Sequence, residues 1–530
     1  MKRFNELSVF LETSSGITPT AATLKRFIGI ISKMGYNKIY LGMADSYKIK
    51  GLPRFGYKRG GYSVEDLREI DEYAKKCGVE LVAQIQILGH LHYLSKYPEF
   101  ADLFDTNDTL LVGDEKVYEL IERMVKTISE GISSTEIHIG MDETFGLGTG
   151  NYLKKNAPTD SKKIFLDHLE RVCAILDKYG YKSVKIWGDM LLDKGKSSMS
   201  YKEIAARLPE SVSIIVWNYE VKDENQLRAM INDGREVSKN VGFAGAVWKY
   251  LSFGPNNAFS SDCILSQMKT CEKCSVDRYM VTLWADNIAP CSNFSALPSL
   301  YVAAEYAAGR IDSAGEIDKN RFSEIVGVDY AALYSLEYVD NPFKEKTTAR
   351  STSSIWVFFS DLLLGNFDTI VPEGVENAYL ELAALYDEYS KNERYGYLFK
   401  TNSSLMRVLA LRAHIPTEIR EAYFKKDKVV ATKIVGKIAK LKSALNEFLK
   451  EFCSYYLHDN FAFGVEVYQG KIAMQIARCD YAVERLNAFI KSDEKIDELE
   501  GGVLPLGYNP MPDISHSLMV DLKMLISYCL

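Results

Sequence analysis

Short apolar runs alternate with longer amphipathic segments along the first 310 residues, and this alternation limits the possible folds more than any other feature. The runs are rich in β-branched residues, and the segments between them have the 3.6-residue period of helices. Parallel strands joined by single helices form either a closed barrel or an open doubly wound sheet, and eight such units in about 300 residues favour the barrel. The predicted strands are residues 8–12, 38–42, 80–86, 136–140, 183–188, 213–218, 242–248 and 279–284.

Four of the intervening segments have clear helical patterns and close on glycine, which suits a helix C-cap. They are residues 20–35, 63–78, 115–131 and 165–180. No dinucleotide-type glycine fingerprint follows the first strand, which argues against a Rossmann fold. The sequence therefore predicts an α/β fold, a (β/α)8 TIM barrel.

The pattern changes after residue 310, where long helical segments at 431–457 and 473–492 follow each other without intervening strands. We predict a barrel over residues 1–315 and an α-helical C-terminal domain over residues 316–530. The change of pattern lies somewhere between residues 310 and 345.

The composition and charge of the chain limit the kinds of molecule that it can bind. The 530 residues are 47% hydrophobic and carry a net charge of -7 with both signs mixed along the chain, which argues against a nucleic-acid or anionic-membrane partner. The first residues lack the apolar run of a signal peptide, and no window reaches the roughly 18 apolar residues of a membrane helix. We therefore expect a cytoplasmic protein.

The cysteines favour reduced thiols over a disulfide framework, because there are nine of them without regular spacing. Cys271 and Cys274 form one CxxC pair, but no second ligand pair stands at a spacing that zinc would need. We expect neither a metal nor a cofactor.

Polar and aromatic residues gather where the predicted strands end, and four of the five tryptophans are among them. In a parallel barrel the loops that follow the strands converge on one mouth. Indole faces stack on the C–H face of a pyranose, while carboxylates and amides bind its hydroxyls, so this set predicts a sugar pocket. Its members are Glu12, Asp45, Gln84, Gln86, His90, His138, Asp142, Glu143, Trp187, Asp189, Trp217, Tyr219, Trp248, Tyr250, Trp284 and Asp286.

The adjacent acids Asp142 and Glu143 would point to opposite faces of an extended strand. A turn that leaves the strand is needed to aim both inward. The stretch GMDETFGLG, residues 140–148, contains three glycines that permit such a turn. A DE pair is normally a solvated surface pair, but its place after an apolar strand favours catalysis.

At this point HIGMDE, residues 138–143, resembles the His-x-Gly-x-Asp-Glu signature of the family 20 glycoside hydrolases, the β-N-acetylhexosaminidases. The stretch from 55 to 91, with its loop, helix and third strand, is similar to one bacterial branch of that family. IWGDML, FAGAVWKY and VTLWADN resemble the ends of its fifth, seventh and eighth strands. The resemblance extends over roughly residues 5 to 310 in the expected order.

The resemblance implies a retaining, exo-acting enzyme in which the 2-acetamido oxygen of the sugar attacks its own anomeric carbon. Glu143 would first protonate the leaving oxygen and then activate water, which requires a raised pKa. Asp142 would orient and polarise the acetamide N–H. The substrate would be an oligosaccharide or glycoconjugate with a terminal β-linked N-acetylglucosamine or N-acetylgalactosamine.

The other roles implied by the resemblance concern binding. Trp187, Trp217 and Trp284 would form the wall around the acetamido group and the ring, and Asp286 would bind a sugar hydroxyl. Either Tyr219 or Tyr250 would donate a hydrogen bond to the acetamido oxygen. His90 and His138 are each either a histidine that fixes a carboxylate or a satisfied core residue.

Two positions depart from the family pattern. The first strand of these enzymes usually ends with an arginine that grips the terminal sugar, whereas this chain has LETSSG there, and Arg59 from the next loop is a candidate replacement. After the eighth strand, Pro290 stands where the branch tends to have a glutamate. The choice between N-acetylglucosamine, N-acetylgalactosamine and a modified sugar therefore stays open.

Two other classes of function fit parts of the pattern. One is a non-catalytic N-acetylhexosamine-binding barrel, but such relatives usually lose the acid, and Glu143 is present. The other is a metal-dependent barrel hydrolase, but the His90-x-His92 pair lies too late in its loop. The oligomeric state stays open, with a homodimer through the helical domain as one possibility.

Overall fold

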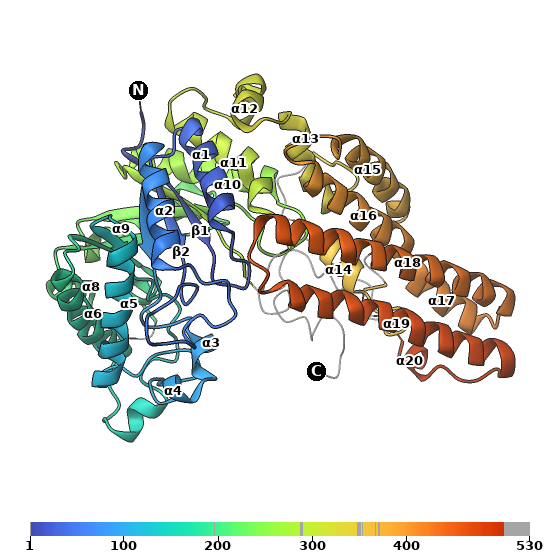
Figure 1. The fold of residues 1–530 in the computed structure, drawn as a ribbon, viewed down its shortest axis with the longest axis horizontal. Helices are drawn as coiled ribbons and strands as arrows, with labels where there is room; N and C mark the ends of the chain where they lie inside the picture. The colour runs from blue at the N-terminus through green and yellow to red at the C-terminus, as the bar shows by residue number, and fades with distance from the viewer. Residues whose placement is uncertain are drawn as a thin grey trace. The chain divides into compact units, whose positions relative to one another are not determined.

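Eight parallel strands close into a barrel in chain order in the computed structural model of the protein (Figure 1). β1 pairs with both β2 and β8, which completes the ring. The α/β barrel predicted from the sequence is confirmed. The strands are β1 Glu6–Glu12, β2 Lys38–Gly42, β3 Glu80–Gln84, β4 Glu136–His138, β5 Ser183–Trp187, β6 Val212–Trp217, β7 Val241–Ala246 and β8 Arg278–Leu283.

The structure describes residues 2–195, 197–286, 290–346, 351, 353–365, 367–368 and 371–502. These residues form two units. The first contains the barrel and comprises Met1–Val247, Ser260–Ala285 and Ser299–Asp318. The second comprises the described parts of Trp248–Phe259, Asp286–Pro298 and Lys319–Leu530.

Helices of the first unit cover the outside of the barrel, with α1 and α2 over β1 and β2 (Figure 1). Local sequence explains their limits: Ser63 and Asp66 form a capping box at the start of α2, and Gly35 ends α1 in the left-handed conformation. These helices are α1 Ala21–Met34, α2 Val64–Lys76, α3 His92–Ser95, α4 Pro98–Ala101, α5 Glu115–Gly131, α6 Ser161–Lys178, α7 Asp189–Leu192, α8 Tyr201–Arg207, α9 Glu224–Val237, α10 Asn257–Lys273 and α11 Leu297–Ala307.

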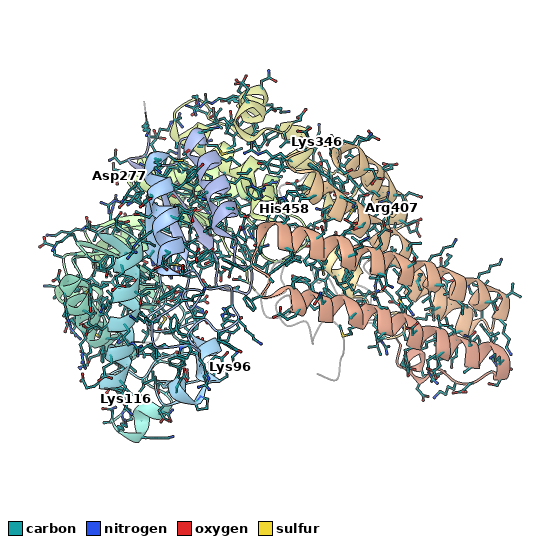
Figure 2. All side chains as sticks on the ribbon, viewed as in Figure 1. Lys96, Lys116, Asp277, Lys346, Arg407 and His458 are labelled. Atoms are coloured by element: carbon teal, nitrogen blue, oxygen red, sulfur yellow. The ribbon has the colours of Figure 1, made fainter. Side chains whose placement is uncertain are left out.

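Alternate residues of the strands point into the barrel and fill it with side chains, as the period of two requires. The inner cluster contains Phe10, Tyr40, Val82, Trp187, Ile215, Ala244 and Met280, with Trp217 and Trp284 packed against it. Charged side chains such as Lys116 and Asp277 instead extend from the outer surface (Figure 2). The barrel is therefore a packed core that supports a site at one end.

Four charged side chains close the amino-terminal end of the barrel. Lys38 Nζ lies 2.9 Å from Glu6 and 2.8 Å from Glu136, and Lys185 Nζ lies 3.2 Å from the other oxygen of Glu136. The hydroxyl of Tyr40 donates to both glutamates, at 2.9 and 2.5 Å. Buried charges are tolerated when each has partners of opposite sign, and this network, here called the charged floor, meets that condition.

The second unit is helical, with α18 and α19 forming a long antiparallel pair (Figure 1). α18 and α19 include the two long helices predicted from the sequence. Among the described residues, no helix is both long and apolar enough to span a bilayer. The main helices are α12 Lys319–Val326, α13 Tyr330–Tyr334, α14 Ser353–Phe359, α15 Val375–Tyr389, α16 Gly396–Arg412, α17 Ile415–Phe424, α18 Lys428–Asp459, α19 Val465–Ser492 and α20 Asp497–Glu500.

Buried carboxylates hold the segment Trp248–Phe259 within the second unit. Asp340 accepts hydrogen bonds from the Ser252 hydroxyl at 2.7 Å and from the Gly254 N–H at 3.2 Å. Glu337 accepts the N–H of Ala258 at 2.5 Å. These hydrogen bonds hold the segment that follows β7 within the helical unit.

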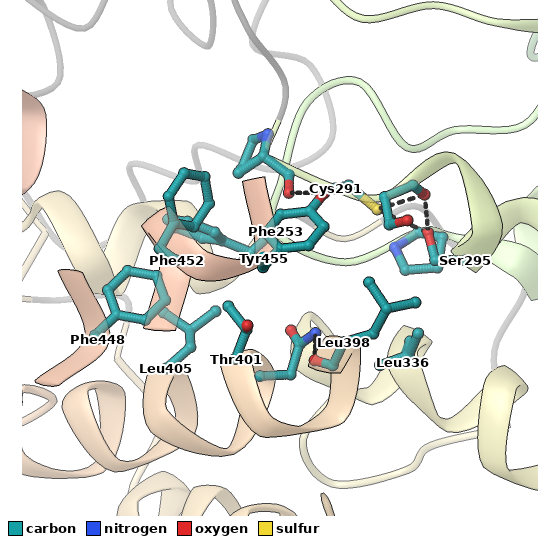
Figure 3. A pocket seen from close by; sticks show the side chains of 14 residues that line it. Phe253, Cys291, Ser295, Leu336, Leu398, Thr401, Leu405, Phe448, Phe452 and Tyr455 are labelled. Atoms are coloured by element: carbon teal, nitrogen blue, oxygen red, sulfur yellow. Dashed lines mark hydrogen bonds between the residues drawn. The ribbon is translucent and has the colours of Figure 1, made fainter. Parts of the chain in front are cut away.

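Residues 290–298 belong to the same unit and lie beside a small apolar cavity, which is also lined by residues of α16 and α18 (Figure 3). The hydroxyl of Tyr455 donates to the carbonyl of Pro290 at 3.2 Å, and Cys291 Sγ lies 3.0 Å from Ser295 Oγ. The cavity measures about 20 Å³, which is room for about one water molecule. Pro290, the position that departs from the family pattern, is therefore part of the packing of the second unit.

Candidate active site

A left-handed turn after β4 places the acidic pair. The strand ends at His138, two residues earlier than predicted, because the chain turns away with φ of 68° at Gly140, 71° at Met141 and 51° at Glu143. Left-handed backbone is unfavourable for residues with a Cβ, so the surrounding contacts must hold it. The turn gives the adjacent acids a common direction that an extended strand would not.

His90 joins the two carboxylates. Its Nε2 lies 3.3 Å from Asp142 Oδ2 and 3.8 Å from Glu143 Oε2. The side chain of Asp142 is 11% exposed, whereas that of Glu143 is 47% exposed. The buried acid is thus fixed by its neighbours, and the other acid is open to a substrate.

Gln86 holds the opposite side of Asp142. Its Nε2 donates to Asp142 Oδ1 at 3.2 Å, and within the described part of the chain its buried Oε1 has no hydrogen-bond partner. Gly140 packs directly on this amide, since a Cβ at residue 140 would lie 2.0 Å from Gln86 Oε1. The glycine of the signature is therefore required by contact as well as by its backbone angle.

Asp189 links the acidic pair to an indole. Its Oδ2 accepts the backbone N–H of Glu143 at 2.9 Å, and its Oδ1 accepts the Trp217 Nε1–H at 3.3 Å. Tyr219 stacks on Trp217 with ring centroids 5.1 Å apart. One continuous set of contacts thus joins β3, β4, β5 and β6 at the carboxyl ends of the strands.

The two acids of the pair have opposite pKa shifts. Burial first, and then the charge of Asp142, raise the pKa of Glu143 above its usual range. For Asp142 burial works in the upward direction, but the His90 imidazolium and the Gln86 amide outweigh it and lower its pKa. Burial works to lower the pKa of His90, but the negative charges of Asp142, Asp108 and Glu143 outweigh it and raise that pKa to about 10. An acid whose pKa is raised beside a carboxylate whose pKa is lowered is the pairing expected of a proton donor and a charge stabiliser.

Aromatic rings lie at the carboxyl ends of β5, β6 and β8, where the acidic pair also lies. Trp187 is buried and lies 5.7 Å from Trp284 and 4.5 Å from His138, measured between ring centroids. Trp217 and Trp284 are only half-buried, so each presents part of its ring. The buried Nε1–H groups of Trp187 and Trp284 find no acceptor among the described residues.

His138 and His90 differ in their surroundings. His138 is fully buried, its Nδ1 accepts the N–H of Gly140 at 3.1 Å, and burial lowers its pKa to about 3, so the ring is neutral. His138 therefore supports the turn from within the barrel core. Of the two histidines, it is His90 whose ring contacts the acidic pair.

Arg59 reaches the ends of β1 and β2. Its Nε donates to Asp45 Oδ1 at 2.8 Å, another guanidinium nitrogen donates to the carbonyl of Ser14, and the group lies 3.6 Å from the ring centroid of Tyr93. Ser14 belongs to LETSSG, where the family usually has its arginine. A guanidinium from the following loop is thus present beside that position.

Three predicted site residues belong to the second unit. Trp248 and Tyr250 are buried and stack on each other at 4.9 Å, in the segment that Asp340 and Glu337 hold. Asp286 is half-buried in the segment that contains Pro290. Their roles at the sugar pocket stay predictions.

Asp108 is a residue of the site that sequence reasoning missed. It accepts the N–H of His90 at 3.1 Å and that of His92 at 3.3 Å, and its carboxylate lies 3.3 Å from His92 Nδ1. In sequence it stands in a polar loop, FDTNDT, with no pattern to separate it from surface acids. Within the described ranges, no group of three or more His, Cys, Asp or Glu side chains is arranged to hold a metal ion.

A closed eight-stranded barrel with paired acids and indoles at the strand ends is typical of barrel glycoside hydrolases. The chain belongs to glycoside hydrolase family 20. The model described as "Glycosyl hydrolase family 20, catalytic domain" matches residues 20–254, and that described as "Glycoside Hydrolase 20C C-terminal domain" matches residues 329–519. The two matches together span most of the chain.

Individual relatives are more distant. The chain is 24% identical to hexosaminidase D of Bos taurus over 212 residues, which cover 38% of this chain and 60% of that protein. It is 23% identical to hexosaminidase D of Homo sapiens, covering 38% of this chain and 43% of the relative. Thus the chain spans less than two thirds of the length of either protein.

Solved structures of the same family were also found. One is the exo β-N-acetylglucosaminidase from Vibrio harveyi in complex with N-acetylglucosamine, with 16% identity, a TM-score of 0.47 and coverage of 64% of this chain and 59% of that one. Another is the β-N-acetylhexosaminidase from Streptomyces coelicolor A3(2), with 18% identity, a TM-score of 0.44 and coverage of 62% and 70%.

Proposed function

We propose that the protein is a retaining, exo-acting β-N-acetylhexosaminidase that removes terminal β-linked N-acetylglucosamine or N-acetylgalactosamine. The observation that carries this proposal is the acidic pair itself. A half-exposed Glu143 with a raised pKa lies beside a buried Asp142 with a lowered pKa, and His90 contacts both. The family membership supports the same reaction.

The pair suits substrate-assisted catalysis, in which the acetamido oxygen of the sugar forms a bond to the anomeric carbon and the glycosidic bond breaks. Neutral Glu143 gives its proton to the leaving oxygen, then takes a proton from the water that opens the oxazolinium intermediate. Asp142, kept ionised by His90, accepts the acetamide N–H and stabilises the positive charge that develops there. No enzyme nucleophile is required.

The indoles supply the apolar part of the proposed pocket. Trp217 and Trp284 present partly exposed faces, and Trp187 closes the base between them, so an acetamido methyl group and a pyranose face would be desolvated there. The Nε1–H of Trp284, which has no acceptor among the described residues, would meet a sugar oxygen. Either Tyr219 or Tyr250 would hold the acetamido oxygen.

Arg59 and Asp45 are proposed to bind hydroxyls of the terminal sugar, because their ion pair lies at the ends of the first two strands. Asp286 is proposed to bind another hydroxyl. These contacts would decide between the two N-acetylhexosamines. The alternative, a sugar-binding barrel without catalysis, gives no reason for an acid with a raised pKa beside the pocket.

The proposed substrate is an oligosaccharide or glycoconjugate. A cytoplasmic location stays a proposal, supported by the sequence pattern of nine cysteines without regular spacing. A homodimer through the helical unit also stays a proposal, and sedimentation of the purified protein would test it.

The direct test compares substrates with and without the acetamido group. We expect release of 4-nitrophenol from its β-N-acetylglucosaminide or β-N-acetylgalactosaminide but not from the plain β-glucoside, because the glucoside lacks the attacking atom. Equal turnover of the glucoside would refute substrate assistance. A thiazoline that mimics the cyclised intermediate should compete tightly, as transition-state analogues do.

Variants of the pair test the two roles separately. Glu143→Gln should abolish hydrolysis of substrates with poor leaving groups, and Asp142→Asn should lower kcat by about 10²-fold or more. Steady-state kinetics with both kinds of substrate would measure this. Unchanged rates in either variant would show that the pair is assigned wrongly.

A further inference from the structure

Glu143 has a strained backbone, and the residues that hold it lie at the end of β5. Its φ of 51° is unfavourable for a residue with a side chain. The carbonyl of Gly140 accepts the N–H of Trp187 at 3.2 Å, and the carboxylate of Asp189 accepts the N–H of Glu143 at 2.9 Å. The turn is thus fixed at its beginning and at its catalytic end.

The other oxygen of Asp189 is also engaged, by the Trp217 indole at 3.3 Å. This indole donor comes from β6, whereas the Glu143 donor comes from the loop after β4. Burial first, and then the charge of Asp142, raise the pKa of Asp189 to about 6, while the two N–H donors act in the opposite direction. Asp189 therefore remains mostly an acceptor at neutral pH.

We propose that Asp189 is a positioning residue that holds the backbone of Glu143 and the indole of Trp217 in fixed relation, so that the acid faces the leaving oxygen of a sugar stacked on that indole. Asp189 is proposed to act through Glu143, because its two oxygens each accept a hydrogen bond from one of the two groups that it would position. This inference rests on the proposed function.

Loss of the acceptor has a specific consequence. Without it, the Glu143 N–H loses its partner and the left-handed residue can relax, which moves the carboxyl group from its working position. Acid assistance matters most when the leaving group is a poor one. A residue that only bound sugar, or only stabilised the fold, would affect good and poor leaving groups alike.

The test measures kcat/KM for 4-nitrophenyl β-N-acetylglucosaminide and for N,N′-diacetylchitobiose, whose leaving group is a sugar hydroxyl. In Asp189→Ala we expect the ratio of the second value to the first to fall about tenfold or more. In the control Asp193→Ala, at the other end of α7, the ratio should stay as in the wild type. An unchanged ratio in Asp189→Ala would overturn the proposal.

A second measurement does not depend on turnover. The indole N–H resonance of Trp217, identified by its absence in Trp217→Phe, should shift in Asp189→Ala and stay in place in Asp193→Ala. If it does not move in Asp189→Ala, the positioning role is wrong whatever the kinetics show. If the wild type hydrolyses neither substrate while the resonance moves as expected, the proposed function alone fails.

Discussion

Residues with left-handed backbone surround the reacting groups. His90, Met141 and Glu143 all have positive φ, and the N–H groups of His90 and Glu143 are each held by a carboxylate, from Asp108 and Asp189 respectively. Such conformations persist only where neighbours impose them, and they concentrate at functional sites. Geometry at the acidic pair therefore depends on residues that would not touch the sugar.

Replacing Asp108 by Asn should lower the pKa of His90, because Asp108 is one of the charges that raise it from 6.5 to about 10. The ion pairs of the charged His90 ring stabilise the folded state. This stabilisation is complete below pH 6.5 and is lost as the pH rises towards about 10, where the ring loses its proton. In Asp108→Asn the ring should lose its proton, and the stabilisation should disappear, at a lower pH than in the wild type. Titration of the His90 ring protons by NMR would measure the shift.

The matched control for that variant is Asp102→Asn, which changes an exposed acid in the same loop. It should leave the titration of His90 as in the wild type. The same pKa in Asp108→Asn and in the wild type would contradict the assignment of Asp108.

Replacing Gly140 by Ala should destabilise the protein and lower its activity together. The new Cβ would be strained at φ of 68° and would also lie 2.0 Å from Gln86 Oε1, so Gln86 must leave Asp142. Gly78→Ala is the control, because Gly78 has φ of 71° but nothing within 4 Å of its Cβ. Strain alone costs about 1–2 kcal/mol.

Urea unfolding and kcat of the two glycine variants would separate these effects. We expect Gly78→Ala to lose stability but keep its turnover, and Gly140→Ala to lose both. Equal turnover in the two variants would show that the Gln86 contact has no part in the reaction.

The sequence predicts that many residues of the candidate site lie together, because the polar and aromatic positions follow strands whose ends must meet. Hydrogen bonds do join Gln86 to Asp142, and Asp189 to Glu143 and Trp217, while their roles stay predictions. The left-handed angles of Met141 and Glu143 were not predictable, because neither residue type favours them. Asp108 was not predicted, because its partner His90 lies 18 residues earlier in the chain and no local sequence pattern indicates that contact.

At the scale of elements, all eight predicted strands are present, but several end one or two residues before the apolar run does. The second strand is Lys38–Gly42, as predicted from the apolar run, and the fifth ends one residue earlier than predicted. β3, β4 and β7 each end two residues earlier than predicted, at Gln84, His138 and Ala246. After β4 the chain leaves strand geometry in the left-handed turn, which the apolar run alone could not predict.

The charged floor makes a prediction about four strands. Glu136 contacts both Lys38 and Lys185, so Glu136→Gln leaves buried positive charge without its partner and should cost about 3–5 kcal/mol of unfolding free energy. Glu80→Gln removes an exposed partner of the same lysine and should cost about 0–1 kcal/mol. Urea unfolding at neutral pH would measure both.

The stabilisation by Glu136 should depend on pH in a direction that its pKa shift determines. Against the effect of burial, Lys185 and Lys38 lower the pKa of Glu136 from 4.5 to about 2. The stabilisation is therefore present above pH 4.5 and is lost as the pH falls towards 2. The difference between wild type and Glu136→Gln should shrink over that range, and a constant difference would argue against the network.

For the whole molecule, ligand binding should stabilise the folded chain by mass action. N-acetylglucosamine at 100 times its Kd would add about 2.7 kcal/mol, because it binds the native state alone. Glucose at the same concentration should add nothing, since it lacks the acetamido group. Calorimetric unfolding of the full chain with each sugar would decide this, and equal shifts would count against an acetamide pocket.

The charged floor also limits how molecules enter and leave the proposed active site. Because side chains fill the barrel and paired charges close its amino-terminal end, substrate, water and products can pass only through the mouth at the carboxyl ends of the strands. The released aglycone must therefore leave before water can reach Glu143 by the same route. An alcohol could attack the oxazolinium intermediate in place of water and give its proton to Glu143, so an abundant alcohol would compete with water for the intermediate and receive the sugar.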